Sequence, residues 1–280
     1  MKEVEKVQNL LVETIKKFKD LCDYLEIRIE DYETTKIAIN TEETERVGTS
    51  LEKGGNVRAL VKGGWGFSSF NDINLLEDYT RRTIEYAKNM GRGKSQFYPV
   101  SPVVDKVSVR PVIDPRGISL RDKKKLLDDY NKIALNYDKE KIRNSMLIYY
   151  DQFKKKYFST SEGTYIEQEI LDLFAVIKII ATKNGIAQSA VVTVGSSNNF
   201  DVCRNLEQKI EEACETSLKY LDASKVKTGV YTVICDPKVT GTFAHEAFGH
   251  TCEADHFYKS ESLQKEMKLG KIFGSKILNI

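Results

Sequence analysis

The chain has 280 residues, of which 41% are hydrophobic, and its 43 Lys and Arg residues nearly balance 41 Asp and Glu residues. A net charge of +2 offers no basic surface for nucleic acid, and the longest apolar run, residues 171–181, is too short to span a bilayer. The N-terminus lacks the apolar core of a signal peptide, and the five cysteines form no CxxC pair. We therefore expect a cytoplasmic protein with reduced thiols that binds neither nucleic acid nor membrane.

Residues 1–95 are predicted to form an N-terminal α/β domain in the order helix, sheet, helix. Apolar residues spaced three and four apart predict an amphipathic helix over residues 2–22. Alternation of apolar and polar residues predicts four strands, at residues 25–29, 34–41, 45–50 and 57–61. Asn71 or Asp72 is placed to cap a second helix, which runs from about residue 73 to 90 and ends at a glycine.

Two glycine-rich stretches interrupt this domain. Residues 53–56, Lys-Gly-Gly-Asn, are predicted to form a turn between strands. Residues 62–67 contain three glycines, but no Lys-Ser or Lys-Thr pair follows them and no GxGxxG motif opens a helix. A β-hairpin beside packed aromatic residues is therefore favoured over a phosphate-binding loop.

Residues 96–118 hold four of the five prolines, which predicts an extended linker and a domain boundary. Residues 119–225 are predicted to form a middle α/β domain. Its expected elements are a helix capped by Ser119 and ending near Tyr137, long antiparallel strands over residues 142–193, and a helix over residues 205–222. Within it, residues 171–181 could also be a buried helix, but their β-branched content and flanking turns favour a strand.

The last segment, residues 226–280, contains all three histidines of the chain. Gly229–Cys235 is predicted to be a strand that Pro237 ends, and a helix is predicted to begin near Val239. This helix is predicted to carry His245, Glu246 and His250, whose side chains are of types that bind transition metals.

The spacing of the first two histidines carries a structural prediction. In the sequence His245-Glu246-Ala247-Phe248-Gly249-His250 they lie five residues apart. On a regular α-helix, five residues rotate a side chain by roughly 500°, which leaves the two imidazoles about 140° apart. Five residues is, however, the repeat of a π-turn, and Gly249 tolerates such a distortion. We therefore predict a π-bulge that brings both imidazoles to one metal ion, with Glu246 as general base.

The neighbouring polar residues have both a functional and an ordinary interpretation. Cys252 could be a third ligand, although a lone cysteine is more commonly a small buried side chain. His256 could bind metal or lie in a solvated loop. Glu253 and Asp255 could orient the ligand imidazoles or belong to a solvated helix face. The histidine pair itself could consist of surface or capping residues.

The segment from His245 to Asp255 resembles the HExxxH segment of the TldD/PmbA family, modulators of DNA gyrase, in its TldD metallopeptidase branch. Three further stretches resemble the family in the same order along the chain. They are Gly55–Val61 with Gly64–Ser69, Ser161–Thr164, and Gly229–Ile234. The resemblance implies an α+β fold with an N-terminal helix–sheet–helix domain. A mainly antiparallel domain with long strands and flanking helices follows, and then the start of a C-terminal metallopeptidase domain at residues 226–280.

The resemblance also implies an activity. It points to a zinc-dependent peptidase that acts on unfolded or partly unfolded peptides, with His245 and His250 as zinc ligands and Glu246 as catalytic acid and base. It implies a dimer, either of identical subunits or with a metal-free PmbA-type paralogue. The alternative class is a non-catalytic subunit that binds peptide or serves in assembly.

One feature departs from the family pattern. The family supplies its third ligand, a cysteine, from a region well beyond the histidine helix, whereas this chain ends at Ile280. We therefore expect the chain to be a fragment or truncated product. With two ligands, its zinc affinity is expected to be low and the chain itself inactive.

Overall fold

The computed structural model describes residues 2–95, 97 and 100–277. For residues 2–6 it describes the backbone only. The chain divides into two compact units, Met1–Ala223 and Ser224–Ile280. The first contains the sheet and most of the core, and the second contains the three histidines.

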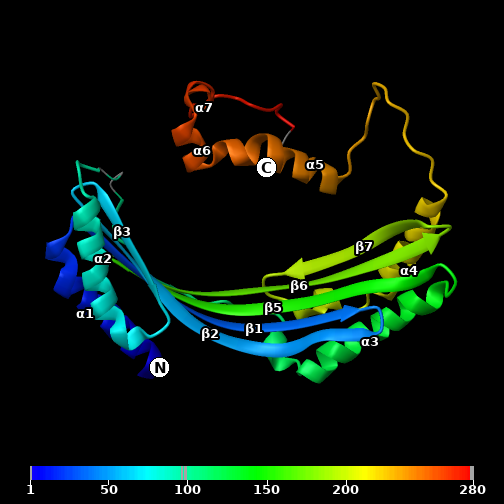
Figure 1. The fold of residues 1–280 in the computed structure, drawn as a ribbon, viewed down its shortest axis with the longest axis horizontal. Coiled ribbons are helices and arrows are strands. Elements are labelled where there is room, and N and C mark those ends of the chain that lie inside the picture. The colour runs from blue at the N-terminus through cyan, green and yellow to red at the C-terminus, as the bar shows by residue number, and fades with distance from the viewer. Residues whose placement is uncertain (1, 96, 98–99, 278–280) are drawn as a thin grey trace. The chain divides into compact units, whose positions relative to one another are not determined.

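One seven-stranded sheet forms the frame of the first unit (Figure 1). Its strands are β1 (Tyr24–Asn40), β2 (Glu43–Val61), β3 (Gly64–Phe70), β4 (Val104–Val107), β5 (Ile142–Thr160), β6 (Tyr165–Lys183) and β7 (Ile186–Ser196). Their order is β3-β2-β1-β5-β6-β4, and β7 also pairs with β6. All pairs are antiparallel except β4 with β6. Because β1 pairs with β5 over fifteen residues, the strands of residues 1–95 and those of residues 119–225 belong to the same sheet.

Four helices pack on the sheet in two groups: α1 (Lys2–Phe18) with α2 (Leu76–Met90), and α3 (Leu120–Tyr137) with α4 (Glu207–Leu221). Each group covers its own hydrophobic cluster. Strand β1 contributes Leu25, Ile27 and Ile29 to the first cluster and Ile37 and Ile39 to the second. Because side chains two residues apart point to the same face of a strand, both helix groups cover one face of the sheet. These observations establish the α+β fold.

The predicted helix caps are present. The carboxylate of Asp72 accepts a hydrogen bond from the backbone of Asn74 at the start of a 3₁₀ turn, Ile73–Leu75, that leads into α2. The hydroxyl of Ser119 accepts one from the backbone of Asp122 in the first turn of α3. Both side chains satisfy donors that a helix leaves unpaired at its N-terminal end. The segment 171–181 lies within β6, so the strand interpretation is confirmed.

The four strands predicted between residues 25 and 61 are two, because β1 and β2 each run through two of them. Two other predicted elements are wrong. Residues 53–56 form no turn, because β2 runs straight through them and pairs there with β1. A Cβ atom at Gly55 would lie 2.5 Å from the carbonyl oxygen of Arg28 and 2.6 Å from the ring of Phe70. A glycine here therefore permits close packing within a strand, a use that sequence alone does not distinguish from a turn.

The second error concerns Gly229–Cys235, which has no regular secondary structure. Its β-branched residues match a strand pattern, but no strand in the described part of the chain pairs with it. Val230 and Ile234 are fully exposed.

The second unit is a series of short helices: α5 (Pro237–Ala244), a π-helical turn (His245–Gly249), a 3₁₀ turn (His250–Cys252), α6 (Ala254–Lys259) and α7 (Glu261–Glu266). Asp236 caps α5 by accepting a hydrogen bond from the backbone of Val239 at 2.8 Å, and Pro237 occupies the first turn. The helix therefore starts two residues before the predicted position. None of the helices in the described residues is both long and apolar enough to cross a membrane.

Candidate metal centre

The predicted π-turn is present between the two histidines. The backbone N–H of His250 donates to the carbonyl oxygen of His245, five residues earlier, which closes one π-helical turn. Gly249 has a φ of −55°, which any residue adopts, and a Cβ atom there would lie 3.8 Å from Nδ1 of His245. The π-turn therefore does not need the conformational freedom of glycine. A Cβ atom at this distance would make an ordinary van der Waals contact with the imidazole, so the local packing does not require glycine either.

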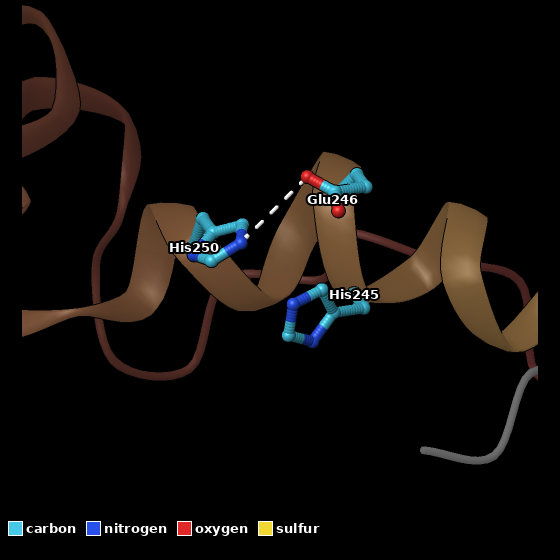
Figure 2. Close-up of side chains that lie close together, drawn as sticks. All are labelled: His245, Glu246 and His250. Atoms are coloured by element: carbon cyan, nitrogen blue, oxygen red, sulfur yellow. Dashed lines mark ion pairs between the residues drawn. The ribbon is translucent and has the colours of Figure 1, made fainter. Parts of the chain in front are cut away.

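The π-turn brings three potential ligands together (Figure 2). The imidazole rings of His245 and His250 lie with their centroids 4.5 Å apart and their planes at 73°. One ligand atom from each of His245, Glu246 and His250 lies within 4.8 Å of the other two. Nε2 of His250 is 3.6 Å from a carboxylate oxygen of Glu246. This spacing suits side chains that surround one small cation.

Glu253 contacts the ring of His250 at Nδ1, the nitrogen that does not face Glu246. Its carboxylate lies 2.7 Å from Nδ1 of His250. This hydrogen bond is the main cause that raises the pKa of His250 above its usual value, and the nearby Glu246 acts in the same direction. Because Nδ1 donates this hydrogen bond, Nε2 is the ring nitrogen with a lone pair available for a metal ion. Histidines that bind metal commonly have this arrangement.

The other predicted residues lie outside this cluster. Asp255 contacts Lys259 at 3.8 Å and forms a second exposed group of potential ligands with Glu253 and His256. Nδ1 of His256 lies 3.1 Å from the carbonyl oxygen of His250. Cys252 is exposed and belongs to neither group.

An aromatic contact that the sequence did not indicate supports the π-turn. The rings of Phe248, on the turn, and Phe273 have centroids 5.4 Å apart. The hydroxyl of Thr251 also donates to the carbonyl of Phe248 at 2.7 Å. Phe248 on the π-turn therefore contacts Thr251, which follows it, and Phe273 near the C-terminus.

The donor set fits a transition metal. The two imidazoles on this turn are ligands that zinc accepts, the carboxylate of Glu246 lies beside them, and the cluster is open to solvent. These features define a candidate hydrolytic metal centre on a distorted helix, next to a carboxylate that can act as a base.

Comparison with known families agrees with this class. Three models of the PmbA/TldA metallopeptidase match the chain in order: domain 1 over residues 25–87, the central domain over 113–226 and the C-terminal domain over 228–280. The chain belongs to the PmbA/TldD family of metallopeptidases.

Individual relatives show the same relationship. A metalloprotease of Synechocystis is 35% identical over 96% of this chain. A zinc metalloprotease TldD homolog of Saccharolobus solfataricus is 26% identical over 86% of it. The chain spans 58% and 53% of the lengths of these two relatives. A crystal structure from Bacteroides thetaiotaomicron, described as a modulator of DNA gyrase, has a TM-score of 0.70 and 17% identity. The match covers 87% of this chain and 56% of that one.

Proposed function

We propose that this chain contributes the metal-binding helix of a zinc-dependent peptidase that hydrolyses unfolded or partly unfolded peptides. The main support is the convergence of His245, Glu246 and His250 on one π-turn, with their ligand atoms within 4.8 Å. A zinc-dependent relative supports the choice of metal.

Each residue has a distinct role in this proposal. His245 and His250, the latter through Nε2, would hold a zinc ion, while Glu253 keeps the His250 ring in place. When bound, zinc polarises a peptide carbonyl and acidifies a water molecule. The carboxylate of Glu246 takes up the proton of the attacking water and later passes it to the leaving amine.

The surroundings of the site are also part of the proposal. Zinc enzymes commonly use three protein ligands, and the family resemblance implies a cysteine beyond residue 280 as the third. We further propose that the peptide binds in an extended form, and that the protein acts in the cytoplasm as a homodimer or with a PmbA-type paralogue.

The test compares metal content and peptidase activity of the complete gene product with those of two variants. Glu246→Gln is expected to retain zinc but to lose about 10²- to 10⁴-fold in activity on an unfolded casein substrate, because a general base is removed. His250→Ala is expected to lose zinc and activity together. Glu261→Gln, an exposed acid in α7, serves as the control.

Unchanged proteolysis in Glu246→Gln would contradict the catalytic role. A gene product that binds zinc but cleaves no peptide would favour the non-catalytic subunit.

A further inference from the structure

A cavity of about 260 Å³ lies between α1 and the turn that joins β5 to β6. The end of β5, the turn and the first residue of β6 line one side of it, with residues 159–161 and 163–165. Helix α1 lines the other side with residues at helical spacing: Val12, Ile15, Lys16 and Lys19. All of these residues belong to the first unit, so the cavity does not depend on the proposed peptidase function.

Two basic side chains border the cavity without a counter-ion. Lys16 and Lys19 are exposed, and neither forms an ion pair within the described residues. Lys17, between them in the sequence, instead pairs with Glu77 of α2. No acidic residue is among the described residues that line the cavity. Two other cavities of the first unit, of about 320 and 190 Å³, both have carboxylates in their lining. The charge at this cavity therefore favours an anion.

Two hydroxyl groups in the cavity wall have no hydrogen-bond partner among the described residues. Ser159 is 3% exposed and Tyr165 is 7% exposed, and both line the cavity. A buried hydroxyl without a partner costs free energy, which a ligand with acceptor oxygens would offset. Burial raises the pKa of Tyr165 to about 12, and the nearby carboxylate of Glu167, which pairs with Lys106, acts in the same direction. The hydroxyl of Tyr165 therefore keeps its proton at neutral pH and can donate it.

The turn adds two further donors. The hydroxyl of Ser161 accepts a hydrogen bond from the backbone of Leu25 at 2.9 Å, and that of Thr164 accepts one from the backbone of Val103 at 3.2 Å. Because each hydroxyl is used as an acceptor, its own proton remains available, and no described residue accepts it. Gly163 gives the turn its shape with a φ of +99°. The donors are thus fixed in place before a ligand arrives, which lowers the entropic cost of binding.

We propose that this cavity binds the phosphate group of a small molecule. A phosphate group carries a charge of about −1.5 to −2 near pH 7 and has three strong acceptor oxygens. Lys16 and Lys19 supply the opposite charge, and the hydroxyl groups of the turn and of the cavity wall supply the donors. A carboxylate has less charge and one oxygen fewer, so the number of donors favours phosphate. Val12 and Ile15 provide an apolar surface for the rest of the ligand.

Isothermal titration calorimetry with inorganic phosphate tests the proposal on protein freed of metal with EDTA and then desalted. The natural chain is expected to bind phosphate with a Kd of about 1 mM or lower. Lys16→Gln and Lys19→Gln each remove one positive charge, and each is expected to raise this Kd by about tenfold. Lys17→Gln is the matched control, because Lys17 lies on the same helix, carries the same charge and does not line the cavity. It is expected to leave the Kd unchanged.

Ser159→Ala and Tyr165→Phe test the unpaired hydroxyls. Each variant removes a donor that makes no hydrogen bond to a described residue, so its midpoint of urea unfolding is expected to be no lower than that of the natural chain. Each is nevertheless expected to raise the phosphate Kd by about threefold or more. A lower unfolding midpoint with an unchanged Kd would show that the hydroxyl has only a structural role, and would contradict the proposed donor.

Acetate, titrated at the same ionic strength, distinguishes the two kinds of oxyanion. It is expected to bind at least about tenfold more weakly than phosphate, and equal binding would overturn the assignment to phosphate. The site itself would be overturned by a natural chain that shows no saturable phosphate binding, or by an equal loss of affinity in Lys17→Gln and Lys16→Gln. Circular dichroism confirms that each variant is folded.

Discussion

Removal of the Glu253 carboxylate is expected to weaken metal binding. Glu253 accepts the hydrogen bond from Nδ1 of His250 at 2.7 Å, and this contact fixes the ring that carries the proposed ligand atom. Loss of a residue that hydrogen-bonds to a metal-binding histidine commonly lowers metal affinity by about 10- to 100-fold. The side chains of His250 and Glu253 are 40% and 48% exposed, so water can replace the lost acceptor. We therefore expect Glu253→Ala to raise the zinc Kd by about tenfold, which is the lower end of this 10- to 100-fold range.

Competition with a chromophoric zinc chelator measures this change directly. Glu253→Gln retains an uncharged acceptor and is expected to fall between Glu253→Ala and the natural chain. Asp255→Asn is the control, because Asp255 contacts Lys259 and makes no contact with His250. An unchanged Kd in Glu253→Ala would refute the orienting role. An equal loss in Asp255→Asn would show that local negative charge, and not the hydrogen bond, determines the affinity.

Two further predictions concern the stability of the first unit, measured by urea denaturation. Lys123 and Asp151 form a buried ion pair at 2.5 Å, with side chains 3% and 2% exposed, so Lys123→Met is expected to cost about 3–5 kcal/mol. Adding Asp151→Leu is expected to recover much of this loss, and a single-variant effect below about 1 kcal/mol would contradict the reasoning. A Cβ atom at Gly66 would lie 2.0 Å from the carbonyl oxygen of Thr83 in α2, so Gly66→Ala is expected to cost about 3 kcal/mol. Gly48→Ala, with nothing within 4 Å of its Cβ atom, is expected to change stability by no more than about 0.5 kcal/mol, and equal effects would refute the packing argument.

The π-turn could be predicted because its cause is local. His245 and His250 are five residues apart, and only a distorted helix brings side chains at that spacing to one face. The caps at Asp72 and Ser119 were predictable for the same reason, since each acts on a backbone group two or three residues away.

The candidate metal cluster was predictable only in part. The sequence indicated that His245, Glu246 and His250 converge, but it could not separate the roles of Glu253 and Asp255. Both are acidic and lie within five residues of His250. Only the three-dimensional arrangement places Glu253 against the imidazole and Asp255 beside Lys259.

Sequence alone determined the periodicities of the helices and strands, the residue types of the candidate metal cluster, and the five-residue spacing that brings two imidazoles together only on a π-turn. Tertiary structure decided which strand-like segments became strands. Residues 53–56 joined β2 because β1 pairs with them, while Gly229–Cys235 stayed irregular because no described strand does. The physical reason is that a helix satisfies its backbone hydrogen bonds internally, whereas a strand needs a partner that can lie anywhere along the chain.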